Sequence, residues 1–229
     1  MKKIFFLVVL HFLLIVAGCK KDDDGSKSVK IVSTASNDGF IVNSNPDVLQ
    51  DYHTGSQGKE IRIGWNGLGY VMRGFLSFDL TTILPANTND EILVVEQAVL
   101  KVYESNTNLH PFDADGVRTV QVELVEYGTL TAADYNTNSI SNCGLIADWG
   151  YNVLQEHHLD VTTRVKTYLN ANPNPDVLQF MLHFTDDDNV DPDTSPLEAN
   201  MWNIFSGDET QLDEYVPVLE VKYHYEKDE

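Results

Sequence analysis

The chain has 229 residues, of which 35 are acidic and 15 are basic, and its formal net charge at pH 7 is −20. This excess of carboxylates disfavours nucleic acid, anionic lipid and polyanionic sugars as ligands, because basic side chains supply the attraction to each of them. A neutral ligand suits such a surface better, and the alternative is that the acidity only keeps the protein soluble. The length fits a single β-rich domain.

The N-terminus has the pattern of a bacterial secretion signal. Lys2 and Lys3 precede an apolar run from Ile4 to Ala17, and small residues then lead to Cys19. This arrangement predicts a lipoprotein signal peptide over residues 1–18 that ends in a lipobox, so that Cys19 is acylated and becomes the mature N-terminus. The alternative is a transmembrane helix, but a membrane span needs about 20 apolar residues and the run is shorter.

Residues 19–30 contain small and charged side chains without apolar periodicity, which predicts a flexible acidic tether. The acidic residues Asp22–Asp24 directly behind Cys19 resemble the surface-export signal of Bacteroidota lipoproteins. That resemblance implies attachment to the outer membrane with display at the cell surface. A lipid anchor that faces the periplasm is the alternative.

From Ile31 onward, apolar and polar residues alternate in short runs, as they do in half-buried strands. The clearest runs cover residues 70–80, 98–102, 120–124, 178–184 and 219–225, and clusters of Gly, Pro, Asn and Asp separate them. In the first run, Arg73, Ser77 and Asp79 are expected on the face opposite the apolar residues. Many short alternating strands predict an all-β fold, an antiparallel β-sandwich over residues 31–229.

One short helix is predicted at residues 161–169, where Val161, Val165 and Tyr168 recur at helical spacing and Asp160 can cap the N-terminus. Once Cys19 is acylated, Cys143 is the only cysteine left, so an intramolecular disulfide is excluded. A packed, unreactive thiol is the expected state of Cys143.

Six blocks, in order along the chain, resemble the DNRLRE-type carbohydrate-binding-module-like domain of secreted bacterial proteins. The blocks are Asn37–Val42, Ile61–Gly64, Arg73–Leu80 with Ile83–Pro85, Ala98–Tyr103, Trp149 with Leu159–Thr162, and Phe205–Ser206 with Glu209 and Pro217–Val221. Together they span nearly all of Asp38–Tyr225, although the tail motif of the family is absent. The resemblance implies a jelly-roll β-sandwich and a non-catalytic glycan-binding function.

Two groups of oxygen-bearing side chains are candidates for a structural calcium ion, which takes about six to eight oxygen ligands. The first group lies in one acidic loop and consists of Asp187, Asn189, Asp191, Asp193, Ser195 and Glu198. Its spacing resembles an EF-hand, but Pro192 stands where that loop needs glycine and a strand pattern precedes it. A calcium loop of another type is therefore the metal hypothesis, and a solvated acidic turn is the alternative.

The second candidate group consists of Asp38 and Glu209, at positions that the family resemblance matches near the first and last strands. The terminal strands of jelly rolls often pair, so these two carboxylates are expected to meet and to bind a structural ion. The alternative roles are a turn cap for Asp38 and a surface salt link for Glu209.

Sugar-binding modules use exposed aromatic rings flanked by polar groups. The candidates for ligand contact are Trp65, in a predicted turn, Trp202 with the neighbouring Asn203, and Tyr215. Arg73, on the same strand face as Asp79, is expected to form an inter-strand ion pair or, alternatively, to contact an anion or a sugar. His157 and His158 are adjacent on a predicted strand and point to opposite faces, so they are not expected to share a metal.

Motifs of known enzyme classes are missing, including the Gly-x-Ser-x-Gly elbow, His-Glu-x-x-His and the Walker loop. The sequence therefore predicts a non-enzymatic, lipid-anchored protein that binds a glycan at the cell surface. A structural or adhesive protein with a protein partner is the second hypothesis. A polysaccharide-degrading enzyme is the third.

Overall fold

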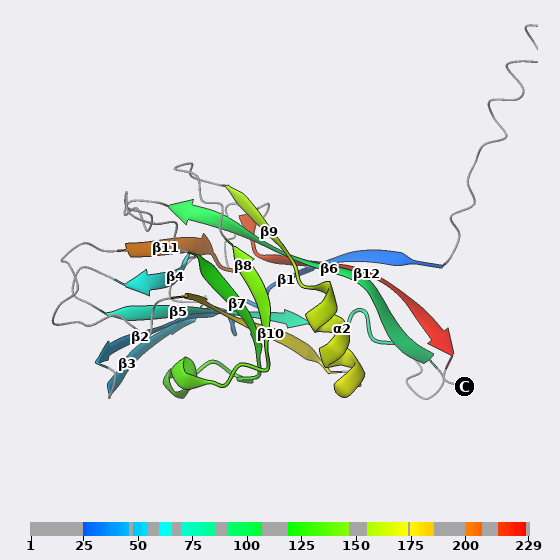
Figure 1. Ribbon diagram of the computed structural model, residues 1–229, viewed down its shortest axis with the longest axis horizontal. Helices are drawn as coiled ribbons and strands as arrows, with labels where there is room; N and C mark the ends of the chain where they lie inside the picture. Colours follow the sequence, from blue (N-terminus) through cyan, green and yellow to red (C-terminus); the bar gives the residue numbers. More distant parts are fainter. Residues whose placement is uncertain are drawn as a thin grey trace, which may run out of the picture.

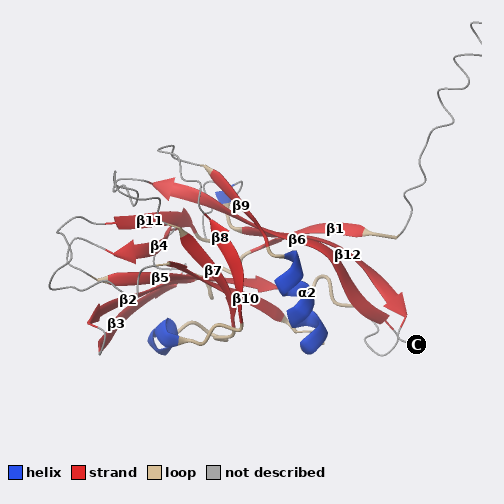
Figure 2. Ribbon diagram, in the orientation of Figure 1, coloured by secondary structure: helices blue, strands red, loops and turns tan. Residues whose placement is uncertain are grey.

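The structure is a computed structural model that describes residues 25–45, 48–54, 60–65, 70–85, 91–106, 119–146, 155–173, 175–185, 200–207 and 215–227. Strands make up most of the described chain (Figure 2). They are β1 (Lys27–Val32), β2 (Gly39–Asn45), β3 (Val48–Thr54), β4 (Glu60–Trp65), β5 (Val71–Asp79), β6 (Glu91–Asn106), β7 (Val120–Val125), β8 (Ser141–Ile146), β9 (Glu156–Asp160), β10 (Val177–Phe184), β11 (Asn200–Phe205) and β12 (Val218–Lys227). A 3-10 turn η1 (Ala132–Asn136) and a helix α2 (Thr162–Ala171) complete the described elements.

All named strand pairs are antiparallel, and they form one strongly curled sheet with two layers (Figure 1). Strands β1, β12, β6 and β9 form the first layer, here the A layer. Strands β11, β4, β5, β10, β7 and β8 form the second, the B layer, which β2 joins through β5 and β3 joins through β2. The pairing of β11 with β6 links the two layers. The predicted all-β jelly-roll sandwich is consistent with this architecture.

The core lies between the layers and is built from the alternating apolar residues. Leu100 and Leu219 from the A layer and Phe78 and Phe180 from the B layer are all fully buried. The rings of Phe78 and Phe180 meet edge to face, with centroids 5.9 Å apart. The strands predicted from period-two alternation are thus confirmed, because their apolar faces are the ones that the two layers cover.

The helix is confirmed, with a shifted N-terminus. α2 begins at Thr162, and its cap position is Val161. The predicted cap residue Asp160 precedes that position, and its carboxylate accepts the N–H of Thr162 at 2.9 Å. Val165 and Tyr168 are buried where α2 packs against β6 and β8. Among the described residues, no helix is long and apolar enough to cross a membrane.

The start of the sheet and the cover of its outer face differ from the simple strand pattern. The ordered sheet starts at Lys27 rather than Ile31, because residues 27–30, assigned to the tether, pair with β12. The outer face of β5, on which Arg73, Ser77 and Asp79 were expected, is partly buried, since Phe75 and Ser77 have no exposed surface. Residues 126–137, including η1, cover this face and are here called the cover segment; Tyr127 packs edge to face on Phe75.

Candidate functional site

The two tryptophans predicted to stack on a sugar are buried, so that expectation of exposed rings is wrong. Trp65 is 4% exposed and Trp202 is 0% exposed. Both lie at inward-facing positions of neighbouring strands, because Trp202 pairs with Ile63 and Trp65 follows two residues later on the same face. The Trp65 ring packs on Phe184 and the Trp202 ring on His157. Large aromatic side chains at core positions contribute more to stability than to ligand contact.

The other two predicted ligand contacts are only half-buried. The Tyr215 ring lies 5.7 Å from that of Tyr103, edge to face, and it also tilts against Phe205. Asn203 lies at an irregularity in the pairing of β11 with β6, and its Oδ1 has no hydrogen-bond partner among the described residues. Ligand contact by Tyr215 and Asn203 stays a prediction.

Several predicted site residues lie outside the described residues. They are Cys19, Asp187, Asn189, Asp191, Asp193, Ser195, Glu198 and Glu209, and Trp149 of the family resemblance also lies there. Within the described ranges, no group of three or more His, Cys, Asp and Glu side chains is placed to hold a metal ion. The acidic-loop calcium site and the meeting of Asp38 with Glu209 therefore stay predictions.

Asp38 is fully buried and accepts hydrogen bonds from two distant parts of the chain. Its Oδ1 accepts the N–H of Ser77 in β5 at 2.9 Å, and its Oδ2 accepts the N–H of Gly207 after β11 at 3.1 Å. Burial raises the pKa of Asp38 from 3.8 to about 7, against the opposite effect of the Ser33 hydroxyl and these two amides. Through these two hydrogen bonds, the carboxylate oxygens of Asp38 hold the turn after β1 to the B layer.

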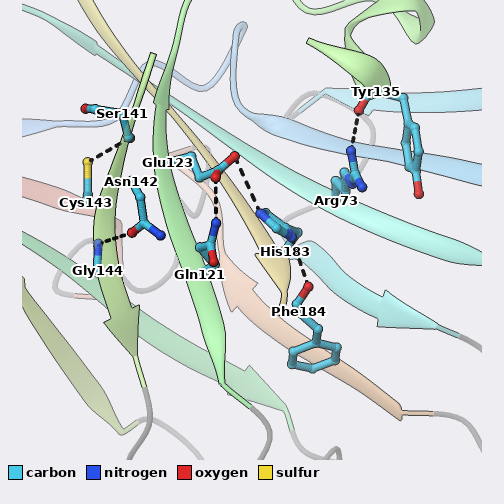
Figure 3. Close-up of polar contacts among 10 residues, drawn as sticks. All are labelled: Arg73, Gln121, Glu123, Tyr135, Ser141, Asn142, Cys143, Gly144, His183 and Phe184. Carbon is cyan, nitrogen blue, oxygen red and sulfur yellow. Dashed lines mark hydrogen bonds and ion pairs between the residues drawn. The ribbon is translucent and has the colours of Figure 1, made fainter. Parts of the chain in front are cut away.

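Arg73 contacts Tyr135 of the cover segment, and its inter-strand ion pair stays a prediction. Its Nη1 donates to the carbonyl oxygen of Tyr135 at 3.0 Å, and its guanidinium lies 4.5 Å from the centre of the Tyr135 ring (Figure 3). Asp79 accepts from the N–H and the hydroxyl of Thr81. Arg73 fastens the cover segment to the sheet.

The two adjacent histidines on β9 point to opposite faces, as predicted. His157 is buried, with Nε2 3.5 Å from Oε2 of the buried Glu104. The side chain of His158 is 52% exposed and contacts Glu156 on the outer face of the A layer. The two imidazoles cannot bind one metal ion in this arrangement.

An open groove of about 370 Å³ crosses the outer face of the A layer. Two rows of paired residues line it, since residues opposite each other on neighbouring strands share a face. The first row runs from Ser28 through Lys222 to Gln97, and the second from Lys30 through Glu220 to Val99. The backbone between the rows, at Val29 and Val221, completes the lining. The hydroxyl, amide, ammonium and carboxylate groups of the two rows thus surround a groove whose base is formed by valine residues.

Ion pairs hold the side chains of the second row in place. Glu220 lies 3.1 Å from Nζ of Lys30 and 3.0 Å from Nζ of Lys101, which also reaches Glu156 at 3.3 Å. The hydrogen bond from Lys101 is the main reason why the pKa of Glu220 is lowered. The Glu220 carboxylate therefore stays ionised at neutral pH and is available as a hydrogen-bond acceptor.

In the middle of the first row, Lys222 is held by Glu96 at 2.7 Å. This contact, with others from Ser26 and His224, lowers the pKa of Glu96 to about 2. His224 lies between two carboxylates, with Nδ1 2.8 Å from Glu96 and Nε2 3.0 Å from Glu226. These contacts raise the pKa of His224, Glu226 having the largest effect. The groove is thus bordered by fixed charges of both signs.

A second polar cluster lies on the outer face of the B layer, on β7 and β10 (Figure 3). Nε2 of His183 is 3.6 Å from Oε2 of Glu123, and Gln121 donates to Oε1 of the same carboxylate at 2.6 Å. Nδ1 of His183 lies 2.9 Å from the carbonyl oxygen of Phe184. An imidazole and a carboxylate are therefore held face to face by hydrogen bonds on their far sides.

Sequence reasoning missed both the groove and the His183 cluster. The alternation of polar residues along β1, β6, β10 and β12 places their side chains on an outer face, which is the only signal that the sequence carries. Which strands become neighbours depends on pairings such as Lys30 with Glu220, which are close to opposite ends of the chain. That proximity is not encoded in any local pattern.

No protein-family model matches the chain, and no curated protein matches it either.

Proposed function

We propose that this chain is a lipid-anchored outer-membrane protein whose sandwich binds a glycan at the cell surface, without catalysis, in the A-layer groove. The observation that carries the proposal is the groove itself, an open space whose volume of about 370 Å³ falls within the usual size range of ligand sites. The lipobox at Cys19 and the resemblance to carbohydrate-binding-module-like domains support the same assignment.

The groove chemistry suits sugar hydroxyls, which both donate and accept hydrogen bonds. Lys30 and Lys222 supply donors, Glu220 supplies an acceptor, and Ser28 and Gln97 supply groups that do both. Val99 offers an apolar floor for the C–H face of a sugar ring. Because the two tryptophans are buried, hydrogen bonds rather than stacking would carry recognition. Each contact is then weak, and attachment to the membrane compensates through a high effective concentration.

Binding of the purified full chain to an array of neutral and acidic glycans tests the proposal. We expect neutral glycans to bind, and Gln97→Ala and Lys222→Ala to weaken binding by about five- to tenfold, the loss of one net hydrogen bond each. Lys166→Ala is the matched control, since Lys166 is an exposed lysine on α2, away from the groove. Equal binding by all four proteins would show that the ligand lies elsewhere.

The same array run with calcium and with a chelator tests the structural calcium ion predicted for the acidic loop. Loss of binding in the chelator would support a calcium-dependent site. If a folded sample binds no glycan on the array, the alternative of a structural or adhesive protein with a protein partner replaces the proposal.

A further inference from the structure

The cluster on the outer face of the B layer has the organisation of a metal site that is separate from the groove. Gln121 and Glu123 lie on β7 and His183 on β10, and the register pairs His183 with Gln121. The side chains of His183 and Glu123 are 11% and 12% exposed, and the Nε2 atom of His183 is itself buried. None of these residues has a part in the proposed glycan site.

The hydrogen bond of His183 to its neighbouring backbone fixes the tautomer of the imidazole. A carbonyl oxygen only accepts, so at 2.9 Å from Phe184 O the Nδ1 atom must carry the proton. In the neutral imidazole, the lone pair of Nε2 then faces the carboxylate oxygen of Glu123. A lone pair against an anion is unfavourable, and either a proton on Nε2 or a cation between the two groups relieves it.

The distance between the two atoms suits a bridging metal. At zinc–ligand bonds of about 2.1 Å, the Nε2–Oε2 separation of 3.6 Å corresponds to an angle at the metal of about 118°, close to the ~109° of a tetrahedral site. The separation is also longer than a charge-assisted hydrogen bond, for which about 2.8 Å is usual. The gap is thus wide for a proton and suitable for a small divalent ion.

Both groups also have the outer hydrogen bonds that orient metal ligands. Metal-binding histidines usually donate their other ring N–H to a carbonyl or carboxylate, and ligating carboxylates are hydrogen-bonded in turn. Phe184 O serves the imidazole, and Gln121 Nε2 serves the carboxylate.

We propose that His183 Nε2 and Glu123 Oε2 bind one zinc-like divalent transition-metal ion, with water completing its coordination and Gln121 as a positioning residue. Imidazole and carboxylate together are ligands typical of zinc, whereas calcium takes oxygen ligands. Two protein ligands predict moderate affinity, with exchangeable positions left for water or a small anion.

Calorimetric titration of the purified full chain with zinc chloride tests the proposal. We expect one site that His183→Gln and Glu123→Gln each weaken at least tenfold, and that Gln121→Ala weakens by about tenfold, as loss of an outer-shell partner does. His158→Gln is the matched control, because His158 also contacts a glutamate but lies on the exposed A layer. It should leave the site unchanged.

Thermal unfolding with and without zinc distinguishes a variant that has lost the metal site from one that has lost its fold. Zinc should raise the Tm of the parent chain and of His158→Gln, and it should leave the Tm of His183→Gln unchanged. The same zinc isotherm for the parent chain and His183→Gln would overturn the proposal, as would no binding at millimolar zinc. If Glu123→Gln binds zinc as tightly as the parent chain does, the bridging geometry is wrong.

Discussion

At the scale of single residues, the buried carboxylate of Asp38 illustrates how one side chain joins distant segments. It connects the turn after β1 to Ser77 in β5 and to Gly207 after β11. Gly207 is required by close packing, since a Cβ there would stand 2.3 Å from the carbonyl oxygen of Ser33 and 3.0 Å from Asp38 Oδ2. The amide of Gly207 reaches the carboxylate only because no side chain stands between them.

The raised pKa of Asp38 predicts that the free energy of unfolding falls as the pH rises from about 4 to about 7. In this window the unfolded chain has lost the proton, with a pKa of 3.8, while the folded chain keeps it until about pH 7. The group therefore favours the folded state at low pH and disfavours it above pH 7, by up to ~4 kcal/mol between the two limits.

Asp38→Asn should remove this contribution, because the amide does not titrate. Urea denaturation between pH 4 and 8 measures it as a smaller change of the midpoint in the variant than in the parent chain. The variant should also be less stable by about 1–3 kcal/mol at pH 5, since its NH₂ faces a backbone N–H that loses its acceptor. Parallel pH profiles for the two proteins would contradict the assignment.

At the scale of elements, the cover segment buries one outer face of the B layer through backbone contacts. Gln179 Oε1 accepts the N–H groups of Tyr127 and Gly128, and its Nε2 donates to the Gly128 carbonyl. Tyr127 OH donates to Asn37 O, and Arg73 holds the far end at Tyr135. A segment without regular structure for most of its length is thus held by a few side chains of the sheet.

Gln179→Ala should loosen this segment without disrupting the strands, since it removes all three hydrogen bonds at once. We expect a loss of about 1 kcal/mol in unfolding free energy, because the half-buried N–H of Tyr127 loses its acceptor, whereas the exposed Gly128 can turn to water. Amide exchange at Tyr127 and Gly128 should accelerate, while exchange in β12 should change less. Gln121→Ala is the control, as Gln121 contacts a side chain and not the cover segment. Uniform acceleration across both layers would instead indicate global destabilisation.

At the scale of the whole molecule, the sequence predicts which segments form strands and which strand faces enter the core. It predicts less well which strands lie side by side and which segments cover them. Alternation identified β5, β7, β10 and β12 because each strand has one face in the core. It placed Trp65 and Trp202 at the surface because their Asn- and Gly-rich surroundings resemble turns, whereas both lie on inward positions of paired strands. The burial of the outer face of β5 does not follow from the sequence, since nothing periodic marks the segment that covers it.

The candidate sites could not be predicted from the sequence either, because they consist of polar residues whose proximity depends on strand order. Glu220 meets Lys30, and Glu123 meets His183, only after the strands have paired. The sequence places these residues on outer faces and goes no further. Asp38 is the exception, since the family resemblance singled it out, although both of its oxygens accept hydrogen bonds in the described structure.

The net charge of −20 bears on the proposed lipid anchor at Cys19. An acidic chain gains no electrostatic attraction from anionic lipid, so attachment should depend on the lipid at Cys19 alone. We expect the protein to stay in the membrane fraction through a high-salt wash, and mass spectrometry to find an acylated Cys19 at the mature N-terminus. Cys19→Ser should abolish that acylation and leave the signal peptide uncleaved. Release of the parent chain by salt, or an unmodified N-terminus at another position, would contradict a lipid anchor.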